Sequence, residues 1–168
     1  GDNNRAAVVP MRGKSKSGIV VKGIHDLAVR FSKCCNPVPG DEIVGFVTRG
    51  RGVTIHRTDC INVLNLPEME RNRLIDAEWQ AEEDEKGTAT YATEISIYAN
   101  NRIGMYVDIA RIFTEREIDV TNMNARTNKQ GKATITMSFD IHGTEELNTL
   151  MAKIRQIDGV LDIERTTG

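Results

Sequence analysis

Two adjacent cysteines followed by a rigid turn most constrain how this chain can fold. Cys34 and Cys35 precede the segment 36–40, NPVPG, in which proline restricts φ and glycine accepts a positive φ. Residues 42–48 and 53–56 are then rich in Ile, Val, Phe and Thr, and a glycine-rich RGRG connection joins them. This pattern predicts a β-hairpin with arginine at its tip.

Four residues in this region are candidate metal ligands: Cys34, Cys35, His56 and Cys60. The three residues between His56 and Cys60 let a turn aim both side chains at one tetrahedral zinc. Neighbouring side chains on extended backbone point to opposite faces, so the adjacent cysteines can share a metal only within a turn. The alternative is that the cysteines are small buried hydrophobic residues. A nucleophilic cysteine is less well supported, because no third group orients the imidazole.

Positive charge gathers in the same part of the chain. Residues 1–63 carry ten Lys and Arg against five Asp and Glu, whereas residues 64–94 carry three against nine. Such an excess suits a phosphate-rich partner such as RNA, and arginine binds phosphate through two parallel hydrogen bonds. A solvated hairpin tip is the alternative. The candidate RNA-binding residues are Arg30, Lys33, Arg49, Arg51 and Arg57.

The remainder of the first domain contains short elements. Residues 19–22 favour a strand, and residues 26–31 a turn or a helix of one to two turns. Thr58 is predicted to cap a helix over 59–66 that Pro67 ends. Residues 74–79 alternate apolar and polar side chains, which indicates a closing strand. The first domain is therefore predicted to be a small antiparallel sheet with one helix.

From Tyr91 onwards the pattern is strand, helix, strand, strand, helix, strand. Met105, Ile109, Ile112 and Phe113 fall at helical spacing, and so do Leu147, Leu150, Met151 and Ile154. Strands are predicted over 120–127, 133–141 and 160–165. This order is the ferredoxin-like βαββαβ arrangement. The fold class of the whole chain is therefore α+β.

The string FSKCCNPVPGDEIVGFVTRGRGVTIHRTDC resembles the conserved-cysteine, ribosome-intersubunit module of long Rel/SpoT-type (p)ppGpp synthetase/hydrolases. Residues 91–168 resemble the ACT domain that ends those enzymes. The resemblance implies a module that lies against ribosomal RNA and the elbow of an A-site tRNA. It also implies a zinc site, since this module has been called a zinc-finger domain.

The resemblance further implies a ligand site in the ACT region. In amino-acid-binding ACT domains, the loop between the first strand and first helix supplies an Asn and a Gly, matched here by Asn101 and Gly104. The predicted site is completed by Met105 and by Asp119 and Val120 at the second strand. The ligand implied is a branched-chain amino acid. Independently of the resemblance, we expect a homodimer formed by side-by-side pairing, because a second copy could cover the apolar edges of one βαββαβ unit. Asp119 departs from the frequent Asn, and many ACT domains are scaffolds without a ligand.

The predicted organisation is a flexible arm at 1–17, the cysteine module at 18–80, an acidic linker at 81–89 and the ACT domain at 90–168. Phosphate-cradling and hydrolase metal-binding motifs are absent from the sequence, so we expect a regulatory region whose parent is a GTP pyrophosphokinase. Three cysteines without a secretory segment favour the cytoplasm, and no apolar run suits a membrane. The alternative is an amino-acid-binding, dimerising module of a metabolic enzyme.

Overall fold

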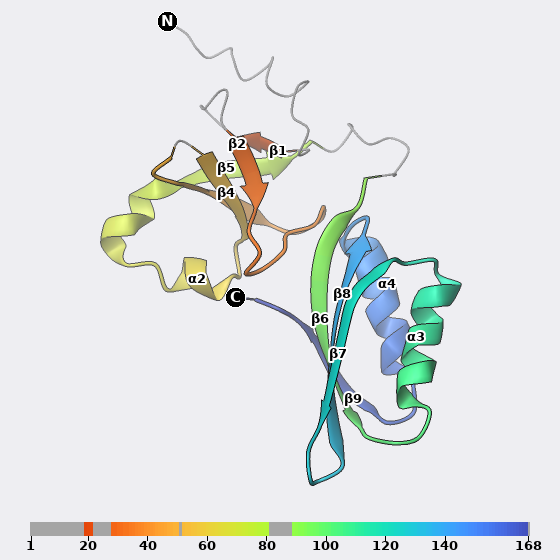
Figure 1. The fold of residues 1–168 in the computed structure, drawn as a ribbon. Coiled ribbons are helices and arrows are strands. Elements are labelled where there is room, and N and C mark those ends of the chain that lie inside the picture. Colours follow the sequence, from red (N-terminus) through yellow and green to blue (C-terminus); the bar gives the residue numbers. More distant parts are fainter. Residues whose placement is uncertain (1–18, 22–27, 51, 81–88, 168) are drawn as a thin grey trace, which may run out of the picture. The chain divides into compact units, whose positions relative to one another are not determined.

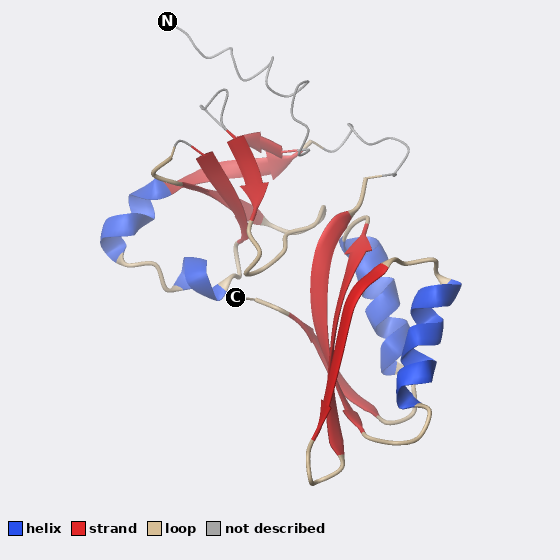
Figure 2. Cartoon of the chain, viewed as in Figure 1, coloured by secondary structure: helices blue, strands red, loops and turns tan. Residues whose placement is uncertain are grey.

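A computed structural model describes residues 19–21, 28–50, 52–80 and 89–167. The chain divides into two compact units, and the division falls between Ala89 and Thr90. Each unit is built around its own β-sheet (Figure 1, Figure 2). The predicted arm at 1–17, Arg51 and most of the predicted linker lie outside the described residues. Within those residues, no helix is long and apolar enough to span a membrane.

The first unit contains a five-stranded sheet with the order β1-β5-β3-β4-β2. Its strands are β1 (Ile19–Val21), β2 (Ala28–Phe31), β3 (Ile43–Val47), β4 (Gly52–Arg57) and β5 (Leu74–Trp79). The predicted hairpin is confirmed, because β3 and β4 pair antiparallel with Val47 opposite Val53. Val53 and Ile55 on β4 are fully buried and form the centre of the core. The β-branched residues of the hairpin thus cover one another across the sheet.

Strand β2 corrects the prediction for residues 26–31. We expected a turn or a short helix there, whereas Ala28–Phe31 is a strand that pairs parallel with β4, with Phe31 opposite Ile55. The first sheet is therefore mixed rather than wholly antiparallel. A four-residue strand has no period long enough to be recognised, and the partner it needs lies far along the chain. Phe31 stacks on Trp79 of β5, with ring centroids 5.6 Å apart and planes inclined by 17°.

The helix after β4 is shorter than predicted. Helix α2 spans Ile61–Leu64, and its N-cap is Cys60 rather than Thr58. The backbone N–H of Thr58 instead donates to the carbonyl of Glu42 at 3.0 Å, which keeps this residue with the sheet. After Pro67 a 3₁₀ helix, η2 (Glu68–Arg73), leads into β5. Its six residues have too little apolar periodicity to be recognised in the sequence.

The second unit has the predicted βαββαβ order, and its four-stranded sheet has the order β7-β8-β6-β9. Its elements are β6 (Tyr91–Asn100), α3 (Met105–Glu115), β7 (Val120–Thr127), β8 (Lys132–Ile141), α4 (Thr144–Arg155) and β9 (Val160–Arg165). Both helices lie on one face of the sheet (Figure 1). The ferredoxin-like prediction is confirmed, because long strands and amphipathic helices carry strong periodic signals.

Alternation along β6 and β8 decides which face the helices cover. Every second residue of these strands is buried, and α3 and α4 contribute buried residues from the opposite layer. Phe113 of α3 meets Phe139 of β8 edge to face, with ring centroids 5.0 Å apart. Strand β7 differs, since it lies at the sheet edge and residues 121–127 are all exposed.

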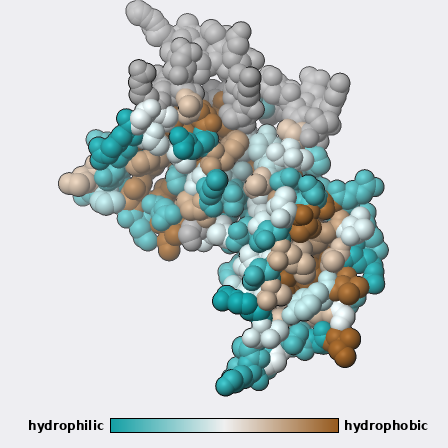
Figure 3. All heavy atoms as spheres, viewed as in Figure 1, coloured by the Kyte–Doolittle hydropathy of each residue, from teal (hydrophilic) through white to brown (hydrophobic). Residues whose placement is uncertain are grey.

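Apolar side chains also reach the surface of both units (Figure 3). The large exposed ones are Ile61, Leu64, Met69, Ile103, Val107, Met123 and Leu161. Scattered apolar residues of this kind are usual on protein surfaces and need no special explanation.

Gly45 on β3 provides a test of packing in the first unit. A Cβ at this position would lie 2.8 Å from Cγ1 of Val53 and 3.1 Å from Cγ1 of Ile75, both on stiff β-branched side chains. We expect Gly45→Ala to lower the free energy of unfolding by about 1 to 3 kcal/mol, since overpacking a dense core costs this much. Urea denaturation followed by circular dichroism measures the change.

Gly50→Ala is the matched control, because a Cβ at Gly50 meets no heavy atom within 4 Å. We expect this change to alter the free energy of unfolding by less than about 0.5 kcal/mol. Equal effects of the two substitutions would contradict the packing explanation.

Candidate functional site

A tight turn brings the two adjacent cysteines to the same point. Cys34 and Cys35 follow β2 within a turn in which the N–H of Asn36 donates to the carbonyl of Ser32 at 2.9 Å. Asn36 has a φ of 49°, a left-handed conformation that Asn tolerates better than most residues. Because the backbone is not extended here, both side chains can point towards one centre. Cys34 and Cys35 therefore lie within a turn, as two adjacent cysteines must if they are to share one metal.

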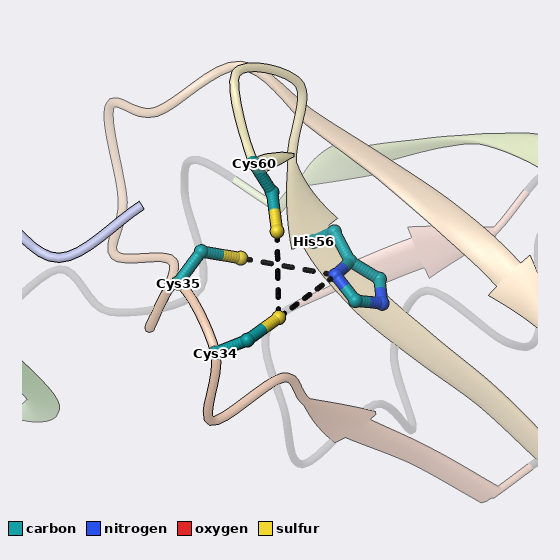
Figure 4. Close-up of side chains that lie close together, drawn as sticks. All are labelled: Cys34, Cys35, His56 and Cys60. Carbon is teal, nitrogen blue, oxygen red and sulfur yellow. Dashed lines mark hydrogen bonds between the residues drawn. The ribbon is translucent and has the colours of Figure 1, made fainter. Parts of the chain in front are cut away.

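The other two residues come from the end of β4 and the turn after it. His56 lies on β4, and Cys60 follows a turn closed by a hydrogen bond from its N–H to the carbonyl of Arg57 at 3.1 Å. The side chains of Cys34, Cys35, His56 and Cys60 converge in space (Figure 4).

Three of the distances between the candidate ligand atoms are close to those of a tetrahedral zinc site. All four atoms lie within 4.8 Å of one another. The Cys34 and Cys60 sulfurs are 3.4 Å apart, and Nδ1 of His56 lies 3.5 Å from the Cys34 sulfur and 3.8 Å from the Cys35 sulfur. Tetrahedral zinc with ordinary bond lengths would separate two sulfurs by about 3.8 Å and a sulfur from a nitrogen by roughly 3.6 Å. The arrangement needs only small shifts to hold the metal.

Burial disfavours the charged form of each group, so it acts to raise the pKa of the cysteine thiols and to lower the pKa of the histidine. It raises the pKa of Cys35 to about 12 and raises the pKa of Cys60. Burial would also raise the pKa of Cys34, but hydrogen bonds led by that from Ser32 outweigh it, so the pKa is lowered. Burial lowers the pKa of His56, which favours the neutral imidazole that a metal requires. A divalent cation would offset the cost of gathering thiolates in this space.

Comparison with known families identifies the first unit. Residues 19–80 match the RelA/SpoT RIS domain, the segment that contains all four clustered side chains. The first unit therefore carries a RelA/SpoT RIS domain. Residues 87–165 match the ACT domain, in agreement with the βαββαβ order of the second unit.

Relatives align with almost the whole chain. It is 35% identical over 158 residues to the GTP pyrophosphokinase of Escherichia coli K12, covering 94% of this chain and 21% of that protein. It is 32% identical over 168 residues to the GTP pyrophosphokinase of Streptomyces coelicolor, covering 96% and 19%. The chain thus spans about a fifth of the length of these relatives.

A solved structure resembles the second unit. It is the ACT domain from the GTP pyrophosphokinase of Chlorobium tepidum, which is 25% identical and has a TM-score of 0.42. The match covers 46% of this chain and 99% of that one.

The candidate RNA-binding residues of the RIS domain separate into two groups. Arg30, Lys33 and Arg49 are exposed. Arg30 lies on β2 and Lys33 just after it, and Arg49 lies on the β3–β4 hairpin turn, beside the start of β2. Arg57 is only 6% exposed, and its guanidinium donates to the carbonyl of Cys35 and the carboxylate of Asp59. Arg57 therefore does not fit the prediction of a surface phosphate contact. Side chains along β4 point alternately to its two faces, and Arg57 falls on the buried face.

The predicted ACT ligand residues also differ in accessibility. Asn101, Gly104 and Asp119 are exposed, and Val120 is half-buried. Met105 is fully buried in the core, so we correct its assignment to a ligand site. Helical spacing already placed Met105 on the apolar face of α3, and that signal was the better guide.

The loop before α3 has a defined structure of its own. Gly104 has a φ of 87°, and Arg102 donates to the carbonyl of Asp158 at 2.9 Å and to the carboxylate of Asp108 at 2.9 Å. The bond from Arg102 lowers the pKa of Asp108. The first turn of α3 therefore already holds a carboxylate that is paired with an arginine.

The sequence analysis did not connect three residues, Ser32, Arg57 and Asp59, with the cysteine cluster. Ser32 contacts Cys34, and Arg57 with Asp59 braces the backbone beside Cys35. Asp59 was expected in the first turn of a helix. The signal available in the sequence was that all three lie close to predicted metal ligands along the chain. Which of their side chains point towards the cluster is decided by the geometry of the turns.

We expect the reduced chain to bind about one equivalent of zinc, because four ligand atoms already lie within 4.8 Å of one another. His56→Ala should reduce the bound metal strongly, and Cys60→Ser should do the same. Native mass spectrometry after addition and removal of excess zinc reports the stoichiometry.

His142→Ala is the control, since His142 is exposed and pairs with Glu146 in the second unit. This variant should bind zinc as the unmodified chain does. A folded, fully reduced chain that retains no zinc would contradict the metal assignment.

Proposed function

We propose that this chain is the C-terminal regulatory region of a RelA/SpoT-type GTP pyrophosphokinase. The observation that carries this proposal is the convergence of Cys34, Cys35, His56 and Cys60 within a RelA/SpoT RIS domain. The RIS domain contacts the ribosome and tRNA, and the ACT domain transmits signals to the catalytic domains of the parent. Catalysis resides in those domains, which belong to the remaining four-fifths or so of a protein the size of the relatives.

Zinc in the RIS domain has a structural role in this proposal. A site with three cysteines and one histidine leaves no open position for a substrate, and closed sites of this kind stabilise folds. The metal would join the turn after β2 to the turn after β4. The chain surface beside these turns would then be held in one shape, as recognition of a structured RNA requires.

Three exposed cations support an RNA-binding surface on the RIS domain. Arg30 and Lys33 lie on and just after β2, and Arg49 lies on the hairpin turn. Structured RNA is bound mainly through its shape, its phosphates and its 2′-hydroxyls. Cations carried by a strand and a tight turn can follow such a backbone with little loss of backbone freedom on binding. The partners proposed are the ribosome and tRNA.

The exposed edge of β7 supports a homodimer of the ACT domain. Unpaired N–H and C=O groups at a sheet edge pair readily with a second strand, and residues 121–127 are exposed along their whole length. Side-by-side pairing would place the Asn101 and Gly104 loop of one protomer near Asp119 of its partner. A branched-chain amino acid is the proposed ligand. Its carboxylate would lie at the N-terminus of α3, and its ammonium would meet Asp119.

The alternative, a dimerising module of a metabolic enzyme, accounts for the ACT domain alone. It gives no role to the clustered cysteines or to the exposed cations of the first unit. The RIS domain match therefore favours the RelA/SpoT proposal.

We expect the chain to bind purified ribosomes with steep salt dependence. Replacing Arg30, Lys33 and Arg49 together by Glu should abolish measurable binding at moderate salt, because three phosphate contacts become repulsive. Single neutral substitutions should each lower the slope of log affinity against log salt by roughly 0.7 to 0.9. Co-sedimentation across a salt series measures both effects.

The matched control reverses three exposed cations of the ACT domain, Lys129, Lys153 and Arg155. It changes the net charge equally and should retain most of the binding. If both triple variants bind alike, the RNA surface lies elsewhere on the chain.

We expect calorimetry with valine or isoleucine to show binding heat, and analytical ultracentrifugation to show a dimer. Gly104→Asp should remove the heat, because a carboxylate at the start of α3 repels that of the ligand. Gly131→Asp is the control, since Gly131 also has a positive φ, of 77°, but lies in the β7–β8 turn. A monomer that is silent towards all twenty amino acids would show that the ACT domain is a protein-contact surface instead.

A further inference from the structure

Ser32 contacts both the side chain and the backbone of Cys34. Its side chain is 5% exposed, and its Oγ lies 2.6 Å from the Cys34 sulfur. The same oxygen accepts a hydrogen bond from the backbone N–H of Cys34 at 3.1 Å. If Cys34 bound a metal as a thiolate, it would carry no proton, and the hydroxyl would then donate to the sulfur. Ser32 thus holds the Cys34 turn at the backbone and the sulfur together.

Arg57 braces Cys35 in a corresponding way from β4. Its backbone N–H donates to the Cys35 sulfur at 3.3 Å, and Nη1 donates to the Cys35 carbonyl at 3.2 Å. Its Nη2 donates to Oδ2 of Asp59 at 2.7 Å. The guanidinium side chain is 7% exposed, whereas that of Asp59 is 60% exposed. Arg57 therefore connects an inaccessible ligand turn to a carboxylate at the surface.

Charge gives this arrangement a physical reason. Zinc with three thiolates and one neutral imidazole carries a net charge of about −1, from +2 and −3. A buried arginine is costly unless its donors are satisfied and an opposite charge is near. The carbonyl of Cys35 and the carboxylate of Asp59 accept from the guanidinium, and a thiolate site would supply the opposite charge in the interior.

We propose that Ser32 and the Arg57–Asp59 pair are positioning residues that hold the Cys34 and Cys35 thiolates in place for a divalent metal. The inference rests on the proposed metal site and adds the residues that set its affinity. Groups that orient metal ligands typically change affinity by 10-fold to 100-fold when they are removed. None of the three contributes a ligand atom to the site.

The test measures zinc affinity of the full 168-residue chain by competition with a chromophoric chelator under reducing conditions. Ser32→Ala and Arg57→Lys should each weaken zinc binding by about 10-fold to 100-fold. Asp59→Asn should weaken it less, because the amide oxygen can still accept from Arg57. Ser32→Thr, which keeps the hydroxyl, should restore most of the affinity lost in Ser32→Ala.

A matched arginine in the same unit controls for stability alone. Arg73 also donates to a backbone carbonyl, that of Val47 at 3.0 Å, and to a carboxylate, that of Glu70 at 2.9 Å. It lies on η2, and neither partner belongs to the cluster. Arg73→Lys and Glu70→Gln should therefore leave zinc affinity within about two-fold of the unmodified chain, a margin well below the 10-fold loss expected at the cluster.

Cobalt absorption provides a second measurement that a purely structural role would not change. At saturating Co²⁺, Ser32→Ala should shift the thiolate-to-cobalt charge-transfer band, because a hydrogen bond to the Cys34 sulfur is lost. Arg73→Lys should leave the band in place. If Arg57→Lys fails to fold, the Ser32→Ala and Asp59→Asn variants test the positioning role without it.

The outcomes separate the two proposals. If the unmodified chain binds neither zinc nor cobalt, the metal site itself is refuted and the positioning role falls with it. If it binds one equivalent, and the Ser32 and Asp59 variants match the unmodified chain in affinity and spectrum, the positioning role alone is overturned. Weakened binding in the cluster variants with unchanged controls supports both.

Discussion

Three sulfurs and one imidazole meet at a single point in the RIS domain, and the surrounding structure depends on that convergence. The contact between Cys34 and Cys60 joins positions 26 residues apart and fixes the turn after β2 against the turn after β4. Both turns are short, and their backbone hydrogen bonds leave little freedom to rearrange. Gathering three thiols in a mostly buried space is unfavourable for their ionised forms. A divalent metal would remove that penalty, and the four side chains lie where one ion could be held.

The surface around this point follows from the same arrangement. Ser32, just after β2, and Arg57, at the end of β4, turn inward to the cluster. Arg30 and Lys33, on and just after β2, remain exposed. Cationic side chains thus have two uses within a few residues of the cysteines. One stabilises the site from inside, and the others face solvent, where phosphate can reach them. In the function proposed above, these exposed cations are the ones that would meet an RNA backbone.

The ACT domain depends on a different constraint, the covering of one sheet face by two helices. Alternation along β6 and β8 places large apolar residues under α3 and α4 and leaves the other face polar. Gly159 and Arg102 keep the loops compact at one end, because the Gly159 backbone approaches Met105 closely and Arg102 crosses to Asp158. Strands β7 and β9 lie at the two edges of this sheet. Strand β7 (Val120–Thr127) is the longer of the two, and it is the edge at which the dimer proposed above would form.

The sequence by itself determined the elements whose periodicity is long or whose turn chemistry is specific. The β3–β4 hairpin, the closing strand Leu74–Trp79 and the whole βαββαβ order were predictable, and so was the set Cys34, Cys35, His56 and Cys60 as one group. Only the tertiary structure decided the parallel pairing of β2, the shortened α2 and the inward turn of Arg57. Each of these depends on a partner distant in the chain or on the local turn geometry. A short strand, a one-turn helix and a single arginine have no pattern that records which partner they will find.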